Sequence, residues 1–175
     1  TPIITIYGII VNDVNGSGCT LSTYSGRIVT TNDDVEETVI RDGSSDDTVF
    51  IDSSTLEMTV TGNNNKTQRI VGLRFQDIPV PKDTEIQKAV IEFVADANSD
   101  EEGTLTIHGQ RSPDAPRFMN NAGDVSSRTK TSASATWELT ADNAWTKNNA
   151  YETVDISNII NELVSQGGWE VYNDI

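Results

Sequence analysis

The chain has 175 residues and carries 27 acidic and 12 basic side chains, which gives a net charge of −15. This length fits one domain with a proper hydrophobic core. Nucleic-acid binding is disfavoured because it needs clustered Lys and Arg, and anionic membrane surfaces are disfavoured for the same reason. The single Cys19 cannot form an internal disulfide, and one Cys with one His cannot build a closed zinc site.

Residues 1–12 are one of the most apolar stretches of this acidic chain. Seven of its side chains are Ile, Val or Tyr: Ile3, Ile4, Ile6, Tyr7, Ile9, Ile10 and Val11. The stretch is shorter than the roughly 20 apolar residues that span a bilayer, and it lacks the basic start of a signal peptide. We therefore expect no membrane insertion. Because Thr1 is not a Met, we expect that a leader has been removed or that the chain starts within a longer protein.

Short runs rich in Val, Ile and Thr continue along the chain, separated by Asn, Asp, Gly and Ser. They predict strands at 3–11, 27–31, 47–51, 55–61, 69–75, 86–95, 103–109 and 132–138. In the run KAVIEFVAD, every second residue from Ala89 to Ala95 is apolar, and this period of two predicts one buried face. Many short strands joined by turns predict an all-β sandwich or barrel.

One helix is predicted near the C-terminus. Its apolar residues keep the i, i+3, i+4 spacing of a single helical face: Ile156, Ile159, Ile160, Leu163 and Val164. Asp155 is placed to cap the first turn, and Gly167 with Gly168 is placed to end the helix. We expect this face to pack on the sandwich rather than to take part in catalysis.

Side chains for catalysis are sparse. His108 is the only histidine and lies in a predicted strand, where an imidazole is more often structural, and no phosphate-binding glycine loop is present. We therefore expect no enzymatic activity. Carbohydrate-binding modules stack sugars on exposed aromatic rings, and Trp145, in the polar stretch TADNAWTKNNAY, is the best candidate platform. A Trp145 ring that packs onto the sandwich is the alternative.

Four blocks make the chain similar to a known module: DDVEE at 33–37, VGLRFQDIPVPKDTEIQKAVIEFVAD at 71–96, VSSRTKTSASATW at 125–137 and VDISNIINELVSQGGW at 154–169. They resemble a β-sandwich domain of large secreted and surface-anchored bacterial proteins, related in architecture to DNRLRE-type and carbohydrate-binding jelly rolls. The resemblance implies a jelly-roll-like antiparallel β-sandwich with one short C-terminal helix, and an extracellular or cell-surface location.

The resemblance also implies a calcium site. It assigns the ligands to Asp34, Glu36, Glu57 and Asp96, since Ca²⁺ takes several oxygen ligands. Crowded carboxylates at 33–37 repel one another unless a cation or an Arg neutralises them. The alternative is an acidic loop paired with Arg41, Arg69 or Arg74.

Two departures from the module concern the ends of the chain. Residues 1–27 are an extension before the sandwich domain of 28–175, and the two strands that usually follow the GW block are missing. An apolar N-terminal strand from one subunit could fill the gap in the next, which is donor-strand complementation and builds a filament. The segment NDVNGSG suits a flexible arm for this exchange. The alternative is that residues 3–11 pair within their own subunit and that the missing C-terminal strands belong to a longer protein from which this chain is cut.

Together these observations predict a non-catalytic structural subunit of an extracellular filament or surface assembly, stabilised by Ca²⁺ and joined to further copies of itself through the N-terminal strand. The alternative function is a polysaccharide-binding or adhesive module of a larger secreted protein.

Overall fold

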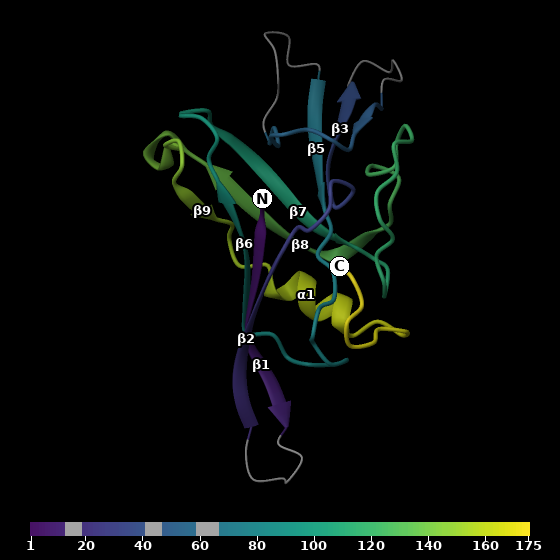
Figure 1. The fold of residues 1–175 in the computed structure, drawn as a ribbon. Helices are drawn as coiled ribbons and strands as arrows, with labels where there is room; N and C mark the ends of the chain where they lie inside the picture. Colours follow the sequence, from purple (N-terminus) through teal and green to yellow (C-terminus); the bar gives the residue numbers. More distant parts are fainter. Residues whose placement is uncertain (13–18, 41–46, 59–66) are drawn as a thin grey trace. The chain divides into compact units, whose positions relative to one another are not determined.

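The computed structural model describes residues 1–12, 19–40, 47–58 and 67–175. The predicted all-β, sandwich-like class is confirmed, since antiparallel strands with one short α-helix make up the described fold (Figure 1). The strands are β1 (Ile3–Asn12), β2 (Cys19–Arg27), β3 (Asp34–Ile40), β4 (Val49–Phe50), β5 (Thr67–Leu73), β6 (Lys88–Val94), β7 (Gly103–Gln110), β8 (Lys130–Leu139) and β9 (Ala150–Glu152). The helix is α1 (Ser157–Val164), and η1 (Ala141–Asn143) is a single 3₁₀ turn.

The chain folds into two compact units. The first comprises Thr1–Arg27, Phe75–Ala115 and Thr129–Ile175, and the second comprises Ile28–Arg74 and Pro116–Arg128. The predicted N-terminal extension, residues 1–27, therefore lies in the same unit as most of the predicted sandwich domain.

The first unit contains a four-stranded antiparallel sheet with the order β2-β1-β6-β9. The N-terminal half of β1 is an inner strand, and Ile4 and Ile6 on it are 1% and 0% exposed. They lie opposite Ile91 and Ala89 of β6, which are also buried. The period-two pattern of β6 predicts burial of Ala89, Ile91 and Phe93 on one face, and all three are buried. Val90 on the opposite face is buried as well, so β6 is covered on both faces at this point rather than on one.

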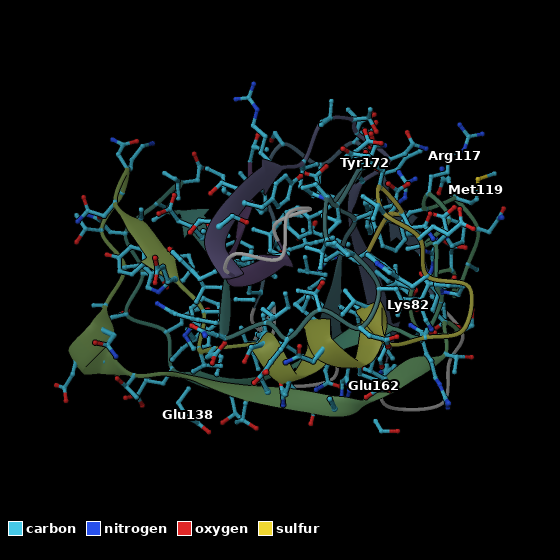
Figure 2. All side chains as sticks on the ribbon, turned by 90° about the horizontal axis from the view of Figure 1, so that it is seen from below. Lys82, Arg117, Met119, Glu138, Glu162 and Tyr172 are labelled. Carbon is cyan, nitrogen blue, oxygen red and sulfur yellow. The ribbon has the colours of Figure 1, made fainter. Side chains whose placement is uncertain are left out.

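Strands β7 and β8 form a separate antiparallel pair in the same unit, and α1 packs against it (Figure 2). The predicted helical face is confirmed: Ile159, Ile160, Leu163 and Val164 are all buried. The N-cap residue is Ile156 rather than the predicted Asp155, although the Asp155 carboxylate accepts a hydrogen bond from the Ser157 N–H at 2.9 Å. The helix ends at Val164, three residues before Gly167.

The second unit contains the three-stranded sheet β4-β3-β5. Val35, Val49 and Phe118 form its hydrophobic cluster, and Ile51 and Val125 pack against them. Arg128 makes a cation–π contact with this cluster, since its guanidinium lies 4.1 Å from the centre of the Phe118 ring. Its Nη1 also donates to the Pro116 carbonyl at 2.7 Å.

Two predicted strands differ from the structure. The strand predicted at 27–31 is not formed: Arg27 is the last residue of β2, residues 28–31 lie outside the strands, and β3 begins only at Asp34. Residues 55–58 of the predicted strand 55–61 are irregular, since the Glu57 N–H donates to the carboxylate of Glu36 instead of to a strand backbone. Residues 59–61 and most of the NDVNGSG segment lie outside the described residues.

Candidate functional site

The predicted assembly strand lies within its own sheet in the single chain. Residues Ile3–Tyr7 pair with β2 on one side and with Glu92–Lys88 of β6 on the other. The intramolecular alternative raised from the sequence is therefore the arrangement of this chain. Exchange of the strand between copies stays a prediction, because the same register can form with β6 of a neighbouring copy.

A bulge divides β1 into two parts at Gly8. The register with β2 shifts between Tyr7 and Ile9, and Gly8 has a φ of 73°, in the left-handed region that favours glycine. Residues Ile9–Asn12 continue beyond the bulge and pair with Cys19–Ser22 of β2. The side chains of Ile9, Ile10 and Val11 lie outside the described part of the structure, so their predicted faces are not tested.

The strands β1 and β2 form a hairpin whose charge differs from that of the rest of the chain. Residues 1–27 hold one of the 27 acidic side chains, Asp13, and one of the 12 basic side chains, Arg27. The net charge of −15 is therefore carried by residues 28–175, which keep the other 26 acidic and 11 basic side chains. We call residues 1–27 the N-terminal hairpin.

The four predicted calcium ligands are divided between the two units. Asp34, Glu36 and Glu57 belong to the second unit, and Asp96, which is exposed, belongs to the first. Within the described ranges, no three acidic, His or Cys side chains gather so that they could hold a metal ion. Calcium binding stays a prediction from the resemblance.

The acidic residues near β3 have protein partners in this structure. Asp33 is fully buried and pairs with Arg74, whose Nη1 lies 2.6 Å from its Oδ1. Glu57 lies 3.3 Å from the Nε of Arg69, close enough for an ion pair although the two groups are not aligned as a hydrogen bond. Pairing with Arg69 and Arg74 is thus observed, whereas Arg41 lies outside the described residues. Burial raises the pKa of the Asp34 carboxyl, and the neighbouring Asp33 raises it further.

The most buried carboxylate of this region was not singled out from the sequence. Glu37 is 0% exposed, and its Oε2 accepts hydrogen bonds from the backbone N–H groups of Val125 at 2.7 Å and Ser126 at 2.9 Å. Its Oε1 is buried and accepts no hydrogen bond from the described residues. Glu37 thus connects β3 to the turn at 123–128 through hydrogen bonds, and we assign it a structural role.

Trp145 lies in a row of four aromatic rings rather than on an open platform. Its ring stacks on Tyr151 with the centroids 4.6 Å apart and the planes 2° apart. Trp137 lies 6.0 Å away, and Phe93 follows it at another 6.0 Å. Since one face of the Trp145 ring is covered by Tyr151, this structure agrees with the packing alternative. Sugar binding by Trp145 stays a prediction.

Comparison of the chain with models of protein families, with curated proteins and with solved structures found no match. The resemblance to the bacterial β-sandwich module therefore stays a prediction. No helix in the described ranges is long and apolar enough to cross a membrane.

Proposed function

We propose that this protein is a non-catalytic structural subunit of an extracellular filament or surface assembly, in which the N-terminal hairpin of one copy pairs with β6 of the next. The observation that carries this proposal is the position of β1. Residues Ile3–Tyr7 of β1 lie between β2 and β6 in the sheet, and Ile4 and Ile6 among them are almost completely buried. The sheet therefore depends on apolar side chains that the N-terminal hairpin supplies.

Strand exchange would keep the β1–β2 contacts and would re-form the β1–β6 contacts between two copies. The pairing of β1 with β2 lies inside the hairpin and moves with it, so the strand pairing that must be broken and remade is the one between Ile3–Tyr7 and β6. Elements that are exchanged between identical subunits re-form the same contacts in the neighbour. A head-to-tail exchange that does not close into a ring extends into a filament.

Cross-linking of mixed copies tests this exchange. Ile3 lies directly opposite Glu92, and both side chains are partly exposed. Opposed strand residues have the Cα separation that a disulfide needs. We would mix copies carrying Ile3→Cys with copies carrying Glu92→Cys, both in a Cys19→Ser background, under assembly conditions.

The expected result is a disulfide-linked dimer of the two variants. A matched control replaces Glu92→Cys by Glu138→Cys, which is exposed on β8 and should not cross-link to Ile3→Cys. If only the double variant Ile3→Cys/Glu92→Cys forms a disulfide, and always within one chain, strand exchange is wrong.

A further inference from the structure

Strand β2 leaves a long edge of the four-stranded sheet open. It is the end strand in the order β2-β1-β6-β9, and it has nine residues. In the part of the chain that the structure describes, its backbone hydrogen bonds join it to β1 and to no other segment. Figure 1 shows β1 and β2 running side by side beyond the end of β6. The outer N–H and C=O groups of such a strand are a template for pairing with another chain.

The residue types that protect many natural sheet edges are missing from β2, and the bulge of this hairpin lies in β1. Its sequence, CTLSTYSGR, contains no Pro, no Lys and no acidic residue, and its single charge is Arg27 at the last position. The opposite edge of the sheet differs, because β9 has three residues and its Glu152 lies 3.7 Å from Lys88. Short and charged edge strands resist pairing, whereas long neutral ones favour it.

The side chains of β2 hold it in the extended form that pairing needs. The side chain of Tyr24 lies over Gly26, since a Cβ at Gly26 would overlap the Tyr24 hydroxyl. The aromatic side chain thus covers the one position of β2 that has no side chain of its own. The Tyr24 hydroxyl donates to the Gln76 carbonyl at 3.4 Å, and Ser25 Oγ lies 3.1 Å from Thr5 Oγ1. These contacts anchor β2 through its faces and leave its outer backbone edge open.

The charge distribution leaves the N-terminal hairpin as the part of the chain where a second copy meets the least repulsion. Residues 28–175 carry a net charge of −15, so two copies repel each other over most of their sequence. The N-terminal hairpin is electrically balanced, with one acidic and one basic side chain, and therefore offers a place where copies can approach without this repulsion. An antiparallel strand edge is also complementary to itself.

We infer that β2 pairs antiparallel with β2 of a second copy of this chain about a two-fold axis. This contact goes beyond strand exchange. Exchange uses β1 and β6, whereas the outer edge of β2 stays open whether β1 pairs with β6 of its own chain or of a neighbour. In an assembly built by exchange, the β2 contact would join subunits laterally.

Charge substitution on β2 tests the contact. Thr23 and Ser25 are exposed, and their replacement by two Lys or by two Glu places like charges opposite each other in a β2–β2 pair. We expect the wild-type chain to dimerise in sedimentation experiments, and more strongly at high salt, which screens the repulsion between the acidic parts. Each double variant alone should bind at least about tenfold more weakly, and an equimolar mixture of the Lys and Glu variants should restore the dimer.

The control is Thr104→Lys/Thr106→Lys, which adds the same charge at exposed positions of β7 and should dimerise as the wild type does. Circular dichroism and melting curves verify that each variant is folded. A wild-type chain that stays monomeric at high salt and high concentration would overturn the inference, as would a mixture that fails to restore dimers. The Ile3→Cys and Glu92→Cys cross-link should persist in the Lys variant. Loss of that cross-link would mean that one interface serves both contacts, and the separate β2 contact would be wrong.

Discussion

Asn161 of α1 forms two hydrogen bonds with the backbone of Ile86, just before β6. Its Oδ1 accepts from the Ile86 N–H at 2.8 Å, and its Nδ2 donates to the Ile86 carbonyl at 3.1 Å. This is the pair of bonds that a residue of a neighbouring strand would make. The helix therefore satisfies the backbone at Ile86 with a side chain, just before the point where the described pairing of β6 with β1 begins at Lys88.

Replacement of Asn161 by Leu should destabilise the first unit by roughly 2 kcal/mol, because the buried Ile86 would lose both hydrogen-bond partners. Urea unfolding followed by circular dichroism measures this change. Asn161→Asp keeps the acceptor and loses the donor, so its stability should fall between those of the wild type and Asn161→Leu. If the Leu variant unfolds at the same urea concentration as the wild type, the proposed role of Asn161 is wrong.

A second helix side chain binds the other strand pair and should make stability depend on pH. The N–H groups of Ala133 and Ser132 donate to the Glu162 carboxylate at 2.7 and 2.9 Å, and these bonds lower its pKa. A carboxyl whose pKa is lower in the folded state stabilises the protein above its unfolded pKa. This contribution should be lost as the pH falls below about 5 and passes through the folded pKa.

The expected result is that Glu162→Gln melts at a lower temperature than the wild type at pH 7, and that this difference shrinks toward pH 3. Because Glu162 is partly exposed, solvent screens its charge and the effect should be small. Glu85→Gln is the control, since Glu85 is exposed and should show no such difference. A gap in melting temperature that stays constant with pH would contradict the role assigned to the Glu162 charge.

Trp145 should be needed for stability through its stack on Tyr151. Trp145→Ala removes a half-buried ring and should cost roughly 2 kcal/mol, since an aromatic pair adds about 0.5–1.5 kcal/mol to the area that it buries. Trp145→Phe keeps a ring on Tyr151 and should recover most of this loss. Thermal unfolding measures both variants. If Trp145→Ala keeps the wild-type melting temperature but loses retention on a polysaccharide gel, the ring acts as a sugar platform instead.

Regular patterns made part of the fold predictable from the sequence. The helix was found because five apolar residues keep one face of a 3.6-residue period, and β6 was found because its apolar residues alternate. Strand β2 was missed because an open edge strand rich in Ser and Thr buries little and has no such pattern. Part of the predicted strand 55–61 failed for another reason, since the Glu57 N–H is bound by a side chain from β3.

The candidate site was predictable only in part. The apolar character of β1 indicated a strand. Its pairing with β6 could not be predicted, because it joins residues about 85 positions apart and no local sequence pattern shows which distant strand lies beside β1. Glu37 carried a usable signal, because it lies two residues after Val35 on the same face of a strand, and a carboxylate on a buried face needs a partner. That partner, the turn at 123–128, is again distant in sequence.

Gly8 should be required for the bulge that ends the pairing of β1 with β6. Any other residue would have to adopt a φ of 73°, and a Cβ at this position would lie 2.6 Å from Cγ of Gln87. Gly8→Ala should therefore destabilise the protein by at least about 1–2 kcal/mol, the cost of a left-handed conformation for a residue with a Cβ. Gly103→Ala is the matched control, because a Cβ there meets no atom within 4 Å. The two variants should differ clearly in urea unfolding. Equal stability would mean that β1 can continue past Tyr7 without the bulge. In that case Gly8 would not be the residue that separates the inner part of β1, Ile3–Tyr7, from the part that pairs with β2 alone.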